Sequence, residues 1–411
     1  MSQGLGSAND RKVALKKMIR ALHEGAEPQE AKQQFAAILR DVSASEVARL
    51  EEELIEEGMP REEIQRLCDV HLALFRESLE GERPSESPDH PIEVLKKEHE
   101  LLLQLAAQLK AVAEEAGTAS NGNAEARAMA MARIREIVQD MKASENHYVR
   151  EENVLFPYLE KHGIVQPPAI MWSEHDRIRA IKKTLYEALS PDGANPDDSL
   201  NQRLRWAANE LADMLASHFY KENNILFPTA LKVMTQEEWM SARQQFAEIG
   251  YWRVVPSGVA PAPEQAEPRA LGAAGDGVVT FETGSIPAGT LEVILNSLPV
   301  DITFVDAEDT VRYFSQTRDR VFPRLKAIIG RKVQQCHPEK SIHVVNRILN
   351  DFRSRKRDSA EFWIQSGGRF ISIRYFALRR ADGHYLGCLE VTQDATALRQ
   401  LQGERRLLED V

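Results

Sequence analysis

Apolar residues recur at helical spacing from the start of the chain to about residue 250. Residues 10–80 contain successive amphipathic runs separated by glycine and proline, which predicts an N-terminal helical domain. The stretch 81–91 is rich in proline, serine and charged residues and is expected to be a linker. Residues 88–250 then predict a second domain that is also entirely helical.

The second helical domain is expected to hold four long helices. Gly163 and the pair Pro167–Pro168 mark the break between the second and the third. A short additional helix is expected to begin at Thr235, whose capping signature ends in Glu238. We place the four long helices at 92–117, 124–161, 170–189 and 200–233.

The pattern changes after residue 250. Residues 251–289 are rich in proline, alanine and glycine and predict an interdomain linker. Residues 290–398 begin with a short helix and continue with the order β-β-α-β-β-β, which is an α+β domain of about one hundred residues. A C-terminal helix or tail follows at 399–411. The expected fold class is therefore multidomain, with two all-α domains before an α+β domain.

Composition and charge narrow the classes of function. The formal net charge of −11 disfavours binding to nucleic acid, because phosphates would be repelled. No uncharged apolar run approaches 18 residues, so we expect no membrane insertion. Three widely spaced cysteines and no visible secretory signal favour a cytoplasmic location, and they exclude a disulfide scaffold.

One eleven-residue motif occurs twice in the second domain. The segment that begins at His147 and ends at Pro157 recurs 71 residues later, and its His-x-x-x-Glu and Leu-Phe-Pro parts are retained. A Glu-His pair at 98–99 also recurs, at an offset of 76 residues. The domain therefore resembles two copies of one helical hairpin, and each copy supplies two histidines and one glutamate.

This duplication predicts a metal centre inside the bundle. A histidine and a glutamate four residues apart lie on one helix face and can point at one spot. A single such pair is usually a surface pair, but two copies in matching surroundings favour ligands. Four imidazoles and two carboxylates are too many for one tetrahedral zinc and suit two octahedral metals bridged by carboxylates. The candidate ligands are His99, His147, Glu151, His175, His218 and Glu222.

Other residues near these ligands are given different roles. Glu98 and Glu174 lie about 100° around the helix from the neighbouring histidines, so they are expected on helix surfaces and not as ligands. His90, beside Pro91, is expected to cap a helix, although it is also a candidate fifth histidine ligand. Tyr148 and Tyr220 could donate a hydrogen bond to a bound ligand, or could simply pack in the core.

Residues 90–230 resemble the hemerythrin-like HHE cation-binding domain through these motifs. The resemblance implies an up-down four-helix bundle with two iron ions, bridged by oxo and carboxylate groups. It also implies that the four histidines are terminal ligands and that Glu151 and Glu222 are bridging ligands. Oxygen-carrying hemerythrins use a fifth histidine on the third helix and an aspartate on the fourth. In this chain Arg179 occupies the position of that histidine and Glu222 the position of that aspartate, which argues against simple oxygen transport.

The flanking regions also resemble known domains. Residues 13–80 are similar to a helical domain of unknown function that precedes such bundles, and residues 290–396 are similar to PAS-type sensor domains. In a PAS-like fold a histidine on a helix can bind heme, so His337 of the Cys336-His337-Pro338 turn is a candidate ligand for heme or another small molecule. The alternative is that this turn only begins a helix.

The combined resemblance implies a protein that binds oxygen or nitric oxide at the iron pair and signals through the PAS-like domain, as a sensor of gas, redox state or iron. A homodimer through that domain and an unidentified protein partner for output are expected. The alternatives are a di-iron enzyme (nitric-oxide reductase, peroxidase or oxidase) and an iron donor for cluster repair. No catalytic residue is assigned. The sequence shows no flavin or iron–sulfur motif that could supply electrons for enzymatic turnover.

Overall fold

The computed structural model describes residues 87–118, 124–189, 198–257 and 277–403, with Ala14, Lys16, Lys17, Glu53, Leu54, Glu57 and Gly58. Apart from those seven residues, the N-terminal domain expected at 10–80 lies outside this description, as do most of the expected linker and the tail from residue 404. The chain divides into two compact units, Met1–Pro261 and Ala262–Val411. No helix among the described residues has the length and apolar character needed to cross a bilayer.

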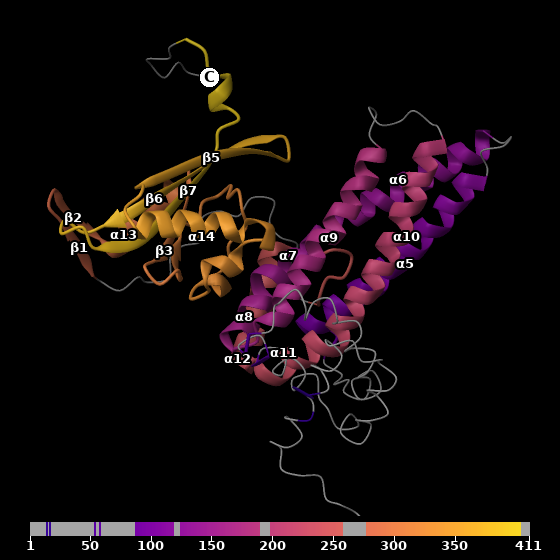
Figure 1. Ribbon diagram of the computed structural model, residues 1–411, viewed down its shortest axis with the longest axis horizontal. Helices are drawn as coiled ribbons and strands as arrows, with labels where there is room; N and C mark the ends of the chain where they lie inside the picture. Colours follow the sequence, from indigo (N-terminus) through magenta and orange to yellow (C-terminus); the bar gives the residue numbers. More distant parts are fainter. Residues whose placement is uncertain are drawn as a thin grey trace, which may run out of the picture. The chain divides into compact units, whose positions relative to one another are not determined.

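Four long helices of the first unit lie side by side (Figure 1). They are α5 (Pro91–Thr118), α6 (Ala124–Ala143), α9 (Gln166–Ala188) and α10 (Asp198–Lys221). Helix α10 packs against α5 and α9, and α6 packs against the same two, so each helix has two neighbours, as in an up-and-down bundle. The core between them is aliphatic and includes Leu102, Leu109, Ile134, Ile178 and Leu211. The expected four-helix bundle is confirmed.

Two of the helical rods contain a π-helical turn. Helix α6 leads through α7 (Glu145–Arg150) and the π-turn η2 (Glu151–Leu155) into α8 (Phe156–Lys161). Helix α10 continues through the π-turn η4 (Glu222–Leu226) into α11 (Phe227–Val233). In each π-turn a phenylalanine N–H donates to the glutamate carbonyl five residues earlier. The duplicated sequence motif thus builds the same backbone irregularity twice, at the predicted ligands Glu151 and Glu222.

The ends of the first unit differ from the sequence expectation in two places. Pro167 and Pro168 lie in the first turn of α9 and begin that helix, since a proline N there needs no hydrogen-bond partner. Residues 251–257, expected in the linker, belong to the bundle, because Trp252 is buried in its core. Helix α12 (Gln236–Ile249) has the expected capping box between Thr235 and Glu238.

The second unit is an α+β domain around a five-stranded antiparallel sheet of order β4-β3-β7-β6-β5. Helix α14 (Glu339–Arg353) packs on β7 (Figure 1). Leu349, Phe352 and Cys388 lie in the core of this unit. The expected order β-β-α-β-β-β is confirmed. The strands are β3 (Asp301–Asp306), β4 (Val311–Phe314), β5 (Ser359–Ser366), β6 (Arg369–Arg379) and β7 (Tyr385–Asp394).

Secondary structure in this unit begins earlier than expected. Strands β1 (Val278–Phe281) and β2 (Gly284–Pro287) form a separate antiparallel hairpin within the region expected to be linker, so that expectation is wrong for these residues. Helix α13 (Ala288–Ser297) follows directly. The described residues of the unit also form the short 3₁₀ turns η5 (Lys326–Ile328), η6 (Val333–Cys336) and η7 (Leu398–Gln400).

Candidate metal centre

All six predicted ligands meet inside the bundle. Their side chains form two groups of four, and within each group one ligand atom per residue lies within 4.8 Å of the others. Both groups contain Glu151 and Glu222, which therefore lie between the two histidine pairs. The first group adds His99 and His147, and the second adds His175 and His218. Each of the six side chains is at most 1% exposed.

The Nε2 atoms of the four imidazoles face the two carboxylates. Nε2 of His99 lies 3.1 Å from Glu222 Oε2, and Nε2 of His218 lies 3.1 Å from Glu222 Oε1. Nε2 of His147 and of His175 lie 3.6 and 3.4 Å from Glu151 Oε2. Since each glutamate approaches a histidine from both groups, each carboxylate has the position of a bridge between two metal ions.

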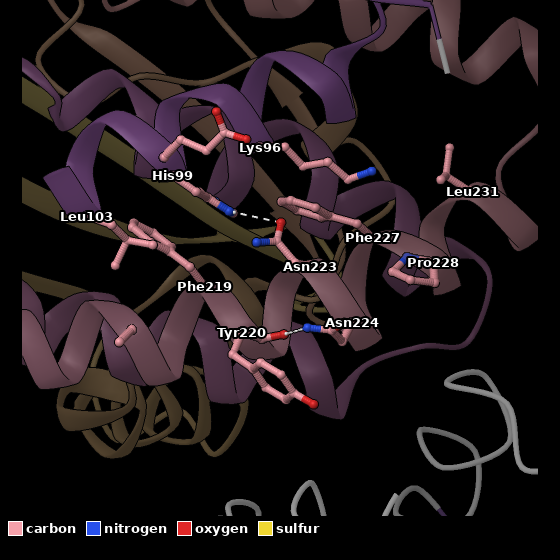
Figure 2. A pocket seen from close by; sticks show the side chains of 12 residues that line it. Lys96, His99, Leu103, Phe219, Tyr220, Asn223, Asn224, Phe227, Pro228 and Leu231 are labelled. Carbon is pink, nitrogen blue, oxygen red and sulfur yellow. Dashed lines mark hydrogen bonds between the residues drawn. The ribbon is translucent and has the colours of Figure 1, made fainter. Parts of the chain in front are cut away.

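The Nδ1 atom of each imidazole is held from outside the pocket. The Nδ1–H of His147 donates to Glu98, that of His218 to Glu174 and that of His175 to Glu152, each over 2.8 Å. The same atom of His99 donates to Oδ1 of Asn223 over 3.1 Å (Figure 2). A partner at Nδ1 fixes the tautomer, so the Nε2 lone pair points inward, as metal-bound histidines require.

Each outer carboxylate is in turn paired with a cation. Arg150 Nη2 donates to Glu98, and Lys221 Nζ donates to Glu174 over 2.6 Å. Arg150 and Lys221 occupy the same position in the two copies of the motif. Glu152 accepts from two nitrogens of Arg179, over 2.7 and 3.1 Å. These pairs keep the outer carboxylates ionised without adding net charge around the pocket.

The protonation states of the inward carboxylates and imidazoles depend on one another. Burial and the neighbouring Glu222 carboxylate raise the pKa of Glu151 to about 8. Burial acts in the same direction on Glu222, but the His218 charge and the other imidazoles facing its oxygens outweigh it and hold its pKa well below the usual range. Burial lowers the pKa of His147 to about 4. Two carboxylates this close do not both ionise at neutral pH unless a cation lies between them.

The inward-facing atoms of the six side chains are better placed to bind metal ions than to hydrogen-bond with one another. Within the described part of the chain, six buried atoms of the site have no hydrogen-bond partner: Nε2 of His99, Nε2 of His147 and all four carboxylate oxygens of Glu151 and Glu222. Leaving one such group unsatisfied costs about 1–3 kcal/mol. Nitrogen and carboxylate donors arranged in this way are typical of first-row transition metals, iron included.

A cavity of about 390 Å³ adjoins one side of the site (Figure 2). His99 lies in its wall together with Leu103, Phe219 and Phe227, and the His99 ring stacks on Phe219 with a centroid separation of 4.0 Å. Asn223 and Tyr220 also line it, and Figure 2 shows the Tyr220 ring turned away from His99. The cavity therefore brings exogenous molecules close to the His99–His147 group.

The remaining candidates lie outside the two groups. His90 is placed at the start of α5, where its Nδ1 accepts from the Ile92 N–H over 3.3 Å, so it caps the helix as expected. The Tyr148 hydroxyl accepts from Lys182 Nζ over 3.3 Å. His337 links η6 to α14 and lies near Glu390, and burial lowers its pKa. A role for His337 in binding heme stays a prediction.

The outer residues of the site are where the sequence-based interpretation failed. Glu98 and Glu174 are buried, at 0% and 7% exposure, and hold His147 and His218, so the expected surface location is wrong. Glu152 and Asn223 were not singled out at all. The signal was present, because Glu98 and Glu174 recur with their histidines and Glu152 and Asn223 occupy equivalent positions of the duplicated motif.

Family models match three consecutive parts of the chain. The hemerythrin HHE cation binding domain matches residues 90–230, a family of unknown function (DUF438) matches 15–81, and a PAS domain matches 291–396. Among solved structures, the C-terminal domain of a Streptococcus mutans protein is 32% identical and covers 31% of this chain and 98% of its own, with a TM-score of 0.30. A PAS domain from Colwellia psychrerythraea is 13% identical, and the match covers 26% of this chain and 97% of that domain, with a TM-score of 0.22.

Curated relatives match a shorter stretch. The iron-sulfur cluster repair protein YtfE of Escherichia coli O81 (strain ED1a) is 36% identical over 95 residues, which is 21% of this chain and 41% of that protein. YtfE of Shigella boydii serotype 18 is 35% identical over the same length and coverage. The chain thus spans about two fifths of the length of these relatives. Together the family matches and the bundle show that this chain carries a hemerythrin HHE cation-binding domain between a DUF438 region and a PAS domain.

Proposed function

We propose that this protein binds two iron ions in its helical bundle and responds there to a diatomic gas or to redox state, with the PAS domain as the signalling partner. The observation that supports it best is the sharing of two buried glutamates by two histidine pairs. Four imidazoles would be terminal ligands, and Glu151 and Glu222 would bridge. Iron held there would supply reversible redox chemistry and a position for oxygen or nitric oxide.

The chain's own residues determine what such a centre does. The outer carboxylates hold three imidazoles in one tautomer, and each of the six inward side chains is at most 1% exposed. Aromatic rings around His99 and His147 keep the surroundings apolar. The Tyr148 hydroxyl, near the pocket, accepts a hydrogen bond from Lys182 and can still donate its own proton.

Metal analysis with visible spectroscopy tests the proposal, on full-length protein purified with and without oxygen. We expect about two irons per chain and a near-ultraviolet charge-transfer band of a bridged iron pair. His147→Ala and His218→Ala each remove one ligand, from different groups, and should each lower the iron content. His162→Ala is the control, since His162 pairs with Glu238 away from the site. Unchanged iron in both ligand variants would contradict the assignment.

The second candidate is iron donation to damaged clusters, which the YtfE relatives favour by their name. A di-iron enzyme is the third. Rapid-mixing experiments with oxygen and nitric oxide separate the three. A sensor forms a stable adduct, an enzyme consumes the gas repeatedly when given an electron donor, and a donor loses iron to an acceptor while it remains folded.

A further inference from the structure

The two halves of the centre are not equivalent. Most positions of the duplicated motif keep their chemistry, as Arg150 and Lys221 do at their shared position. The position that follows the bridging glutamate does not. It is Glu152 in the first copy and Asn223 in the second. Because each of these residues supports a histidine of the other hairpin, one histidine has a neutral support.

That histidine is His99. Its Nδ1 donates to an amide oxygen over 3.1 Å, whereas the other three imidazoles donate to carboxylates over 2.8 Å. A carboxylate at Nδ1 raises the basicity of the imidazole and strengthens its bond to a metal, and a neutral amide does so less. His99 is therefore the weakest imidazole donor of the four.

The same end of the centre faces the cavity. Leu103 lines the cavity beside His99 (Figure 2), and the position equivalent to Leu103 in the second hairpin is Arg179. The Arg179 guanidinium binds Glu152 twice and also Glu145, over 2.8 Å, so ion pairs cover the back of His175. Beside His99 there is thus an apolar side chain and a cavity, where the equivalent place beside His175 holds ion pairs.

We propose that the His99–His147 group is the exchangeable position of the centre, where a divalent transition metal is taken up and released through the cavity, and that Asn223 sets the rate. Asn223 acts here as a positioning residue, through His99. The inference rests on the proposed function, since it requires two metal ions. It predicts that the two ions leave at different rates, and that the faster rate responds to changes at Asn223 and Leu103.

Release of Co(II) from the full-length protein tests this. The protein is loaded with Co(II) alone, and loss of its visible absorption is followed after excess chelator. Wild-type protein should lose the two ions in separate phases. Asn223→Asp gives His99 a carboxylate support and should slow the fast phase about tenfold or more, the usual size of such effects. Asn224→Asp is the matched control, because Asn224 lines the same cavity but bonds the Tyr220 carbonyl.

A second variant tests the route independently of the hydrogen bond. Leu103→Phe adds bulk to the cavity wall and leaves the His99–Asn223 contact in place, so it should slow the fast phase without changing the amount bound. The proposal would be overturned if Asn223→Asp and Asn224→Asp changed the fast phase equally. It would also be overturned if neither Asn223→Asp nor Leu103→Phe slowed that phase. Two bound ions released in one phase would overturn it while leaving the proposed function intact. Wild-type protein that binds no metal would overturn both.

Discussion

Glu98 illustrates how much a residue that is not a ligand can contribute to this site. It accepts from His147 Nδ1 and from Arg150, and the Trp252 N–H lies 3.4 Å from its other oxygen. Each contact fixes the carboxylate in the orientation that keeps the Nε2 lone pair of His147 inside the pocket. The support of this ligand therefore combines α5, α7 and the segment after α12.

Glu98→Gln should weaken metal binding. The amide keeps the shape and one acceptor but removes the charge, so His147 becomes a poorer donor, and we expect metal affinity to fall by about 10–100-fold. Glu100→Gln is the control, because Glu100 lies on the same helix with its side chain exposed. Competition titration with a chelator gives the affinity, and thermal unfolding of the metal-free protein shows whether the fold is retained. Equal affinities in the two variants would contradict the role.

The six inward residues could be predicted from the sequence because the motif is duplicated, whereas the residues behind them were missed. One residue turns a helix by about 100°, which moves Glu98 away from the line of His99 and suggests a surface location. In a four-helix bundle that direction can face the adjacent helix instead of solvent. Glu98 therefore reaches His147 on α7, a contact between the two arms of one hairpin that helical periodicity alone does not reveal.

Lys182 predicts a pH dependence of stability. It is 2% exposed and donates to Ser144 and Tyr148, and burial lowers its pKa to about 8. Between about pH 8 and its ordinary pKa of 10.5, the unfolded chain binds the proton that the folded chain has lost. Stability therefore rises with pH across this window, by up to about 3 kcal/mol.

Lys182→Met removes this titration at nearly constant volume. Chemical denaturation of wild type and variant at several pH values isolates the contribution, because other groups titrate alike in both. We expect the stability difference, wild type minus variant, to grow in favour of wild type from pH 8 to 10.5. A difference that stays constant would show that Lys182 is not held neutral by burial.

At the scale of elements, each copy of the motif begins a π-turn at the glutamate that carries the inward carboxylate. Pro157 and Pro228 follow each turn and cannot donate a backbone hydrogen bond, and Asn153 and Asn224 donate to the carbonyl four residues earlier. The sequence predicted uninterrupted helices here. Periodicity reports which face is apolar, and one extra residue in a turn shifts that face too little to detect.

Strand β7 supplies a prediction at this scale. Gly387 has φ +142°, and a Cβ there would lie 2.1 Å from the Val305 carbonyl oxygen of the neighbouring strand β3. Gly387→Ala should therefore destabilise the PAS domain by about 2 kcal/mol or more. Gly368→Ala is the control, since Gly368 also has positive φ, at +77°, but open space around it, and should cost about 1 kcal/mol.

Calorimetry of the full-length protein measures both glycine variants. The transition of the strand-rich unit should move to lower temperature with Gly387→Ala and move less with Gly368→Ala. Metal content should be the same in both, because the ligands lie in the other compact unit. Equal shifts would mean that the close approach of β3 does not determine the choice of glycine.

At the scale of the whole molecule, the order of domains could be predicted but the extent of the linker could not. Proline, alanine and glycine content predicts a linker over 251–289, yet its first residues pack on the bundle and residues 278–287 form a hairpin. Composition averages over such short elements. The β-branched and aromatic residues of Val278–Phe281, followed by Gly284, carried the hairpin signal.

The expected homodimer has a candidate surface in α13. None of its residues is buried within its own unit. Val293 and Ile294, near the end of the helix, and Leu298, which follows it, are 39–45% exposed. Exposed apolar side chains of this kind favour burial against a second copy of the same segment. Self-association through α13 would bring two PAS domains together.

Val293→Glu combined with Ile294→Glu should convert the dimer to a monomer, because four carboxylates would face each other across the two-fold axis. Sedimentation at several protein concentrations measures the change. Met129→Glu is the control, since Met129 is 69% exposed on the bundle and should leave the dimer intact. A wild-type protein that stays monomeric at high concentration would contradict the expected homodimer, and the signal would then have to pass from the bundle to a different protein.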